Sequence, residues 1–173
     1  MKMYLKVLLS AAALGAVASP AFAQASAAAS TTSTTRILQG ISATTTTNLA
    51  FGTVVRPSTG TNSIVIDATT GARTSTGGGD AALVTSTTSR AAYAVAGEGG
   101  QTFSVSVPAT VTMTSGANTL VVTTTNTGAT GTLSGTIGSA GTATVGVGGS
   151  FPIAAATATG NYTVTFNTTV AYN

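Results

Sequence analysis

The sequence predicts an all-β fold with a single domain, in the form of a β-sandwich. After the first 23 residues the chain is rich in threonine, alanine, glycine and valine. β-Branched side chains favour strands, whereas glycine favours turns and bulges. Short apolar or alternating segments recur between Gly, Asn, Ser and Pro breaks, at the spacing typical of sandwiches. Beyond residue 23, no segment of ten or more residues has the apolar periodicity of a helix.

Residues 1–23 have the features of a secretory signal peptide. Lys2 and Lys6 precede an apolar run from Val7 to about Ala18, and the helix-breaking Pro20 follows it. Ala21-Phe22-Ala23 then places small residues at the first and third positions before a cleavage site. The apolar run is shorter than the roughly 18–20 residues that a membrane-spanning helix needs. We therefore expect cleavage near Gln24 and a secreted protein without a membrane anchor.

Residues 24–43 are interpreted as an N-terminal extension of the domain. The stretch 24–35 contains alanine, serine and threonine but no large apolar residue, so alone it should be a mobile tail. Residues 36–43 contain Ile37, Leu38 and Ile41 and are a candidate strand. The predicted domain then extends from residue 44 to residue 173.

The remaining strands are predicted from short apolar runs and alternation. With the first candidate, the expected segments are 36–43, 48–55, 63–68, 81–85, 91–96, 102–107, 111–114, 119–125, 130–134, 143–147, 151–155 and 162–172. The glycine-rich stretches 71–80, 97–100 and 146–150 are expected to be turns or bulges, because glycine reaches positive φ cheaply. The threonine runs 44–47 and 123–125 are expected to form solvated strand faces.

The last predicted strand, residues 162–172, has one apolar face. Side chains alternate between the two faces of a strand, so every second residue from Tyr162 to Tyr172 lies on the same side. A long strand at the end of a chain leaves a sheet edge that some other segment must cover. The sequence therefore raises the question of what covers this edge.

The charge balance argues against a nucleic-acid partner. The net charge of +3 includes the two lysines of the leader. The rest of the chain carries four arginines and three carboxylates, which are scattered and form no basic stripe. Without its leader, the chain is therefore nearly neutral.

The inventory of reactive side chains predicts no catalytic residues, no metal site and no cofactor. Histidine and cysteine are absent, and lysine is absent after residue 23, so the usual nucleophile and zinc sites cannot be assembled. The carboxylates Asp67, Asp80 and Glu98 lack the tryptophan-lined cleft of a glycosidase. Gly77-Gly-Gly-Asp80 lacks the lysine of a phosphate loop and the spaced carboxylates of a calcium loop, so it is interpreted as a turn.

Two sets of motifs resemble known families. The segment Leu49-Ala-Phe-Gly-Thr-Val-Val55, a glycine at position 160 and an aromatic penultimate residue, Tyr172, resemble the marks of subunits of chaperone–usher pili. The order of Leu49, Gly71-Ala-Arg73, Gly77-Gly-Gly79, Ala94-Val-Ala-Gly97, Val147-Gly-Gly149 and the final tyrosine is similar to a family of small secreted proteins known only as a domain of unknown function.

The pilin resemblance implies an incomplete immunoglobulin-like sandwich that a donor strand completes. The N-terminal extension of one subunit would fill a groove beside the C-terminal strand of the next, and the homopolymer would grow head-to-tail. A periplasmic chaperone and an outer-membrane usher are the implied partners, with export to the cell surface through the periplasm. The implied donor residues are Ile37, Leu38, Gly40, Ile41 and Ala43. The implied acceptor groove and chaperone-binding strand contain Gly160, Tyr162, Val164, Phe166, Val170 and Tyr172.

Other interpretations fit the same residues. The apolar face of the last strand also suits the core of a complete sandwich, and Ile37, Leu38 and Ile41 could form the first strand of their own subunit. The alternative function is that of a self-contained secreted β-sandwich, acting as a cell-surface or biofilm-matrix adhesive protein. A threonine-rich solenoid of the ice-binding kind is disfavoured, because no fixed period relates the threonine runs.

Overall fold

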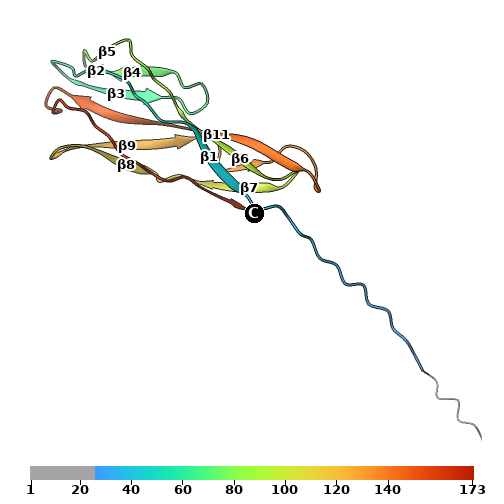
Figure 1. The fold of residues 1–173 in the computed structure, drawn as a ribbon. Helices are drawn as coiled ribbons and strands as arrows, with labels where there is room; N and C mark the ends of the chain where they lie inside the picture. The colour runs from blue at the N-terminus through green and yellow to red at the C-terminus, as the bar shows by residue number, and fades with distance from the viewer. Residues whose placement is uncertain (1–25) are drawn as a thin grey trace, which may run out of the picture. The chain divides into compact units, whose positions relative to one another are not determined.

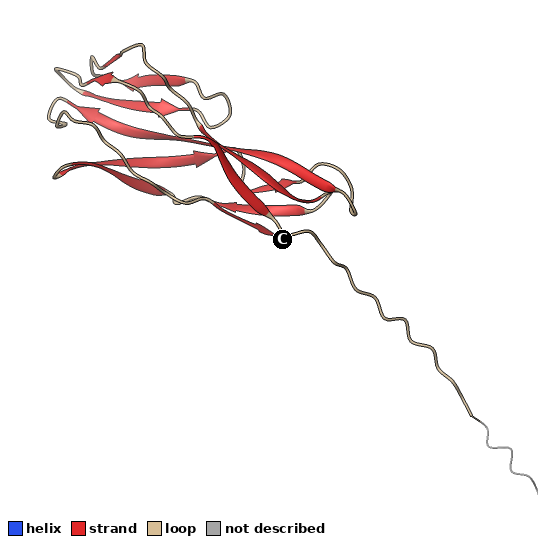
Figure 2. Cartoon of the chain, in the orientation of Figure 1, coloured by secondary structure: helices blue, strands red, loops and turns tan. Residues whose placement is uncertain are grey.

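The structure, a computed structural model, describes residues 26–173; the predicted signal peptide lies outside the described residues. Every regular element in residues 26–173 is a strand (Figure 2). This part of the chain therefore includes no helix that could cross a membrane. The all-β prediction is confirmed, and the strands form a sandwich. Residues 26–35, taken by themselves, are exposed and belong to no strand.

Twelve strands lie within residues 42–172. They are β1 (Ser42–Thr47), β2 (Val54–Val55), β3 (Thr61–Ile66), β4 (Arg73–Gly77), β5 (Ala82–Leu83), β6 (Ala91–Glu98), β7 (Thr102–Ser106), β8 (Thr110–Ser115), β9 (Asn118–Asn126), β10 (Thr130–Thr132), β11 (Ala140–Ala154) and β12 (Thr169–Tyr172).

The strands form one large sheet and two small ones (Figure 1). The large sheet has the order β1-β6-β11-β3-β4, and it continues through β9, which pairs with β11, to β8. A three-stranded sheet has the order β10-β7-β12, and β2 pairs with β5. All the pairings are antiparallel.

The long strand β11 organises the large sheet. Its residue Val147 pairs with both β6 and β9, and its residue Gly149 pairs with both β3 and β9. A strand has two edges, so β9 lies along one edge of β11, while β6 and β3 follow one another along the other. Strands β4 and β5 lie between β3 and β6 in the chain. We call this segment, residues 67–90, the β4 and β5 excursion.

The prediction of a turn or bulge at residues 146–150 was wrong, because β11 runs through them without interruption or register shift. The glycines serve close packing instead of a turn. A Cβ at Gly146 would lie 2.2 Å from the carbonyl oxygen of Ala68, and one at Gly148 would lie 2.2 Å from that of Ile66. Glycine is thus required where another backbone approaches the strand. The predicted turn at 71–80 also contains a strand, β4, which pairs with β3.

Two apolar clusters form the core. The first joins β6 and β11 to β7, with Val95, Phe103 and Val147 among its buried members. The second joins β3 and β11 to β8 and β9, with Ile64, Val122 and others. Phe166 contacts both clusters from the C-terminal segment. The core is thus continuous along the sandwich, and its last contributor lies near the end of the chain.

The first strand lies later in the chain than the predicted 36–43. Strand β1 begins at Ser42 and pairs with β6 of its own domain, with Ser42 opposite Ala96. The register would place Gly40 opposite Glu98, where β6 ends, so no β6 residue remains to pair with residues 36–39. All six residues of β1 are exposed, as expected for a solvated threonine face at 44–47.

The predicted strand 162–172 is also shorter than expected. Only Thr169–Tyr172 forms a strand, β12, which pairs with β7. Upstream, Thr163 forms an isolated bridge with Thr114 of β8. The residues between β7 and β8 include Pro108, which has no N–H to donate to a ladder. The pairing is therefore interrupted over residues 164–168.

Candidate functional site

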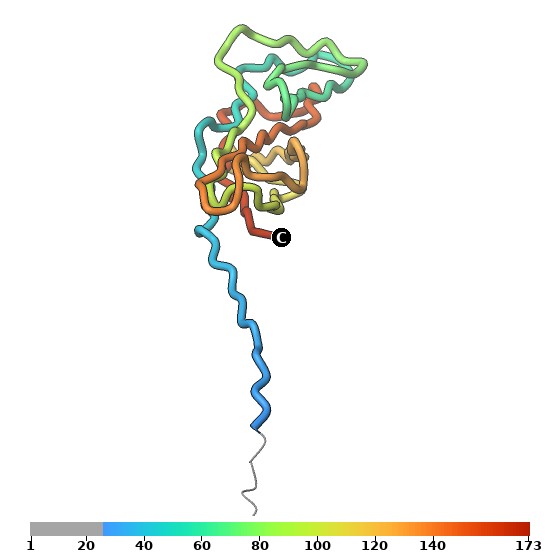
Figure 3. The backbone as a smooth tube through the Cα atoms, turned by 90° about the vertical axis from the view of Figure 1, so that its right-hand side faces the viewer, coloured from blue at the N-terminus to red at the C-terminus, as the bar shows by residue number. Residues whose placement is uncertain are grey.

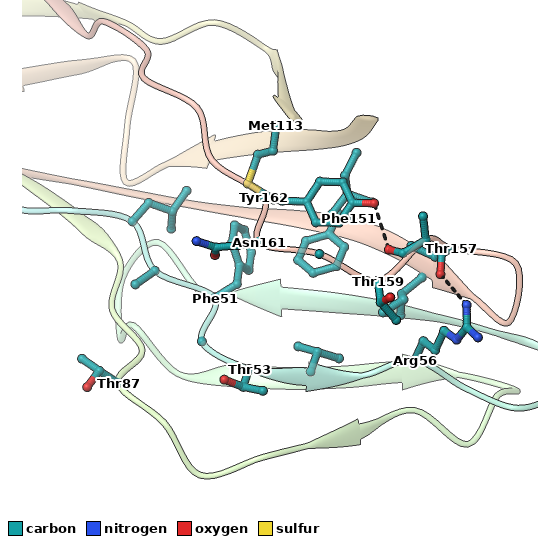
Figure 4. A pocket seen from close by; sticks show the side chains of 18 residues that line it. Phe51, Thr53, Arg56, Thr87, Met113, Phe151, Thr157, Thr159, Asn161 and Tyr162 are labelled. Atoms are coloured by element: carbon teal, nitrogen blue, oxygen red, sulfur yellow. Dashed lines mark hydrogen bonds between the residues drawn. The ribbon is translucent and has the colours of Figure 1, made fainter. Parts of the chain in front are cut away.

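A groove with an apolar floor and a largely polar rim separates two segments that are far apart in the sequence. The first wall is residues 49–56, and the second wall is residues 157–168. A cavity of about 570 Å³ and a neighbouring one of about 170 Å³ lie between them. The two cavities share Leu49, Phe51, Met113 and Tyr162 in their linings, so they form one groove. We call it the apolar groove (Figure 4).

The floor of the apolar groove belongs to the second core cluster. Val111 and Val122 line the smaller cavity, and Phe151 and Ile153 line the larger one. The ring of Phe51 packs edge-on against that of Phe151, with 4.9 Å between the centroids and 79° between the planes. These four floor residues are buried, so the apolar surface that the groove leaves accessible comes from half-buried side chains such as Phe51, Met113 and Leu120.

The backbone of the first wall is held by residues of the β4 and β5 excursion. The Arg73 guanidinium donates hydrogen bonds to the carbonyl oxygens of Phe51 at 2.8 Å, Thr53 at 3.0 Å and Val84 at 2.6 Å. The N–H of Ala50 also donates to the carbonyl of Ser89 at 2.8 Å. These contacts attach the backbone of the first wall to residues outside the second wall.

The second wall leaves the sheet between two points of attachment. Thr163 exchanges backbone hydrogen bonds with Thr114 at 3.0 and 3.1 Å, and β12 begins only at Thr169. Residues 164–168 lie in no strand. The Val164 side chain is 39% exposed, and the buried hydroxyl of Thr168 has no hydrogen-bond partner among residues 26–173. The second wall therefore has an exposed apolar side chain and a buried hydroxyl group that lacks a hydrogen-bond partner in the described chain.

Two hydrogen bonds join the chain segment that contains the first wall to the one that contains the second wall. At one end of the groove the Arg56 guanidinium donates to the carbonyl of Thr157 at 3.0 Å. Beyond the groove, the Tyr172 hydroxyl donates to the carbonyl of Gln39 at 2.9 Å. Within the described chain, no other hydrogen bond connects residues 39–56 with residues 157–172. The two segments therefore run antiparallel.

Both backbone polar groups of Gln39, the N–H and the carbonyl, form hydrogen bonds. Its N–H donates to the Glu98 carboxylate at 3.1 Å, and the N–H of Gly138 donates to the other oxygen of that carboxylate. The Tyr172 hydroxyl, which donates to the Gln39 carbonyl, also accepts from the Glu98 N–H at 2.6 Å. We call Glu98 and Tyr172 the Gln39 clamp. Figures 1 and 3 show the C-terminus at the end of the sandwich where β1 starts.

The electrostatics of the clamp favour an ionised Glu98. Its side chain is 3% exposed. The N–H of Gly138 and then that of Gln39 lower the pKa of the Glu98 carboxyl below its ordinary value of 4.5, and they outweigh the effect of burial. The positive charge of Arg36 acts in the same direction. Glu98 is therefore a charged acceptor for backbone N–H groups.

The other two carboxylates stabilise loops. Asp80 accepts hydrogen bonds from the Ser58 hydroxyl at 2.5 Å and from the N–H of Thr59 at 3.2 Å, and these lower its pKa. Asp67 accepts from the N–H and the hydroxyl of Thr70, which lower its pKa. Residues 26–173 contain no group of three or more His, Cys, Asp or Glu side chains that could hold a metal ion.

The structure brings four of the predicted acceptor residues to the apolar groove. Gly160 and Tyr162 line the larger cavity, and Tyr162, Val164 and Phe166 line the smaller one. The Tyr162 hydroxyl donates to the carbonyl of Ala158 at 2.9 Å, within the same wall. Val170 and Tyr172 lie in β12 instead, where they pack against the first core cluster.

The predicted donor residues are divided between solvent and the protein's own domain. Ile37 is 86% exposed and Leu38 is 36% exposed, and Gly40 has no neighbour within 4 Å of a Cβ placed on it. Ile41 packs against the first core cluster, and Ala43 pairs with Val95 within β1. The five residues therefore do not form one free strand.

Sequence reasoning missed the first wall and part of the floor as components of the groove. Large apolar members of this set in the larger cavity are Leu49, Phe51, Val54, Met113, Leu120, Phe151 and Ile153. Leu49 and Phe51 are two positions apart, so they would share one face of a strand. This spacing was the signal in the sequence that could have indicated an apolar wall. Nothing local in the sequence indicated that the face would meet residues 157–166.

Comparison with known proteins identifies a family. Residues 41–172 match a family model described as a domain of unknown function, DUF4402. No curated protein and no solved structure matches the chain. The match begins two residues after Gln39 and ends at Tyr172, so it covers all twelve strands and both walls of the apolar groove. This protein is a member of the DUF4402 family.

Proposed function

We propose that this protein is the structural subunit of an extracellular filament, in which a strand from one copy fills the apolar groove of the next. The observation that carries the proposal is the groove itself. The buried core residues Phe151 and Val122 lie at its floor beside the half-buried Phe51, and within the described chain one hydrogen bond, from Arg56 to Thr157, connects its two walls. Filling it would remove apolar surface from water.

A β-strand is the occupant that suits this geometry. Residues 164–168 belong to no ladder, and backbone groups next to an apolar surface need hydrogen-bond partners. An added strand supplies them, and every second side chain of that strand can point to the floor. Because the two walls are antiparallel, the strand would run parallel to one wall and antiparallel to the other.

The occupant is proposed to come from a second copy of the chain. Residues 26–38 are all exposed and lie in no strand. They carry one charge, Arg36, and the lining of the groove also carries one, Arg56. A nearly uncharged segment that ends in Ile37 and Leu38 therefore suits an apolar groove. Donor and acceptor are different surfaces, so the contact propagates head-to-tail.

The remaining parts of the proposal follow from assembly. A subunit with an open groove needs protection before it meets a neighbour, which supports a periplasmic chaperone and an outer-membrane usher as partners. The predicted signal peptide supports export. The inventory of side chains supports a structural role without catalysis, because histidine and cysteine are absent from the sequence.

Two variants test the proposal. The first lacks residues 24–38, and the second is Val164→Asp, which places a charge at a groove position that is already partly exposed in the monomer. Both should be exported and folded, but neither should form filaments, because a buried unpaired charge or a missing strand prevents filling of the groove. Electron microscopy measures the filaments, and immunoblotting of cell fractions measures export.

Val121→Asp is the matched control. Val121 is 50% exposed in β9 and does not line the apolar groove, so filaments should form normally. Normal filaments from both test variants would refute the proposal. A mature wild-type protein that remains a stable monomer in size-exclusion chromatography, without a chaperone, would instead support the self-contained adhesive sandwich.

A further inference from the structure

We infer that the Gln39 clamp sets the boundary between the segment that a subunit donates and the segment that its own sandwich keeps. This inference rests on the proposed function. It moves the donor from residues 36–43 to the residues before Gln39, and it assigns Glu98 and Tyr172 a positioning role in assembly.

The clamp holds Gln39 through contacts that its own domain provides. Both backbone polar groups of Gln39 are engaged, the N–H by the Glu98 carboxylate and the carbonyl by the Tyr172 hydroxyl. Hydrogen bonds to a charged group are stronger than neutral ones. The approach of Tyr172 also depends on Gly97, because a Cβ at that position would lie 2.2 Å from the tyrosine oxygen.

The residues on the two sides of Gln39 differ in their environment. After it, Ile41 packs against the first core cluster, and Ser42 starts the ladder with β6. Before it, Leu38 and Ile37 are exposed and have no strand partner. Donating residues 41–43 would require a subunit to break its own β1 pairing, whereas donating residues up to 38 requires no such break.

The position of the clamp explains why it would control assembly. The clamp attaches Gln39 to the end of β6 and to β12, so the donor segment leaves each subunit at a fixed point. Leu38 directly precedes that point. The clamp therefore determines how far the apolar residues of the donor can reach into a neighbour, and so which of them meet the groove floor.

Disulfide cross-linking tests the boundary, because the natural chain contains no cysteine. One double variant, Ser42→Cys with Ala96→Cys, joins residues that are opposite one another in the β1 and β6 ladder. The other, Leu38→Cys with Val164→Cys, joins the proposed donor to the groove. In assembled filaments, the first should cross-link within one copy and the second between copies. Non-reducing electrophoresis separates these outcomes as a monomer band and a ladder.

Two further variants are needed in case a chosen pair of cysteines cannot reach the geometry of a disulfide bond. Thr44→Cys with Ala94→Cys is a second pair in the same ladder, and Ile37→Cys replaces Leu38→Cys for the donor. Filaments in which Ser42→Cys cross-links to Val164→Cys of another copy would overturn the boundary while leaving strand donation intact. Absence of filaments from the wild-type protein would instead refute the proposed function.

Hydrogen exchange tests the clamp in the isolated monomer, where assembly has no influence. Tyr172→Phe and Glu98→Gln should each raise the exchange rate of the Gln39 amide by about tenfold, because local opening no longer costs these hydrogen bonds. Tyr162→Phe is the control, since its hydroxyl contacts Ala158 within the second wall of the groove. Unchanged exchange in both clamp variants would show that Gln39 is not held, and it would overturn the inference.

Discussion

The hydroxyl of Tyr172 donates a hydrogen bond to the carbonyl of Gln39 at 2.9 Å, and it thereby joins residues 133 positions apart. The same oxygen accepts from the N–H of Glu98 at 2.6 Å. One hydroxyl group therefore connects the beginning of the domain, the end of β6 and the final strand. Its removal should affect stability and the path of the N-terminal segment together.

We expect Tyr172→Phe to lower the free energy of unfolding by about 1–2 kcal/mol. The change leaves the partly buried N–H of Glu98 and the Gln39 carbonyl without a partner, and such losses cost about this much. Urea titration of the mature monomer measures the effect. Tyr162→Phe, which removes a single hydrogen bond within one wall, should have a smaller effect. Equal losses would argue against a special role for Tyr172.

Gly97→Ala should destabilise the domain by about 1–3 kcal/mol, because the new methyl group would displace the Tyr172 side chain. It would also come within 3.0 Å of Leu133. Gly40→Ala adds the same group where nothing lies within 4 Å, so it should change stability by less than about 1 kcal/mol. Thermal unfolding of the two variants side by side provides the measurement. The prediction fails if the two variants melt together.

The wild-type protein should lose the contribution of Glu98 in acid. The pKa of this carboxyl is lowered in the folded state, so its stabilising effect is present above about pH 4.5 and disappears as the pH falls through the folded-state pKa. Glu98→Gln lacks this titration. The difference in unfolding free energy between the two proteins should therefore shrink below pH 4.5 and stay constant from pH 6 to 8, as measured by urea titration at each pH. A constant difference at all pH values would contradict the assignment.

Thr168→Val should stabilise the monomer by about 1 kcal/mol. The Thr168 hydroxyl is buried without a partner in the described structure, and replacing it by a methyl group removes the desolvation cost at nearly constant volume. Thr165→Val, at an exposed position, should change the free energy of unfolding by less than about 0.5 kcal/mol. A loss of stability in Thr168→Val would indicate that the hydroxyl has a partner in solution.

The strand content of the chain was accessible from the sequence, whereas several boundaries were not. Strands β6, β7, β8 and β9 lie close to their predicted ranges, because apolar residues recur there between clear turn signals. Strand β11 was divided in two by the expectation that Gly146 and Gly148 form a turn. Glycine also permits close approach of a second backbone, and a local pattern does not distinguish these two uses.

Of the two walls of the groove, the second wall could be predicted from the sequence. The alternation from Tyr162 to Phe166 placed these residues on one face, and the structure places them in a wall of the groove. The opposite wall depends on Arg73, whose guanidinium holds the carbonyls of Phe51 and Thr53 from about 20 positions away. Such a contact depends on tertiary structure. The division of the N-terminal segment at Gln39 similarly depends on Glu98 and Tyr172, which are distant in the sequence.

The uncovered rims of residues 164–168 and of β1 have a consequence for handling the purified protein. Unpaired amide and carbonyl groups beside a hydrophobic opening are a template for misdirected, amyloid-like stacking of molecules. Concentrated, partner-free preparations should therefore precipitate in a thioflavin-positive form, and a short peptide copied from residues 26–38 should slow this precipitation by occupying the vacancy.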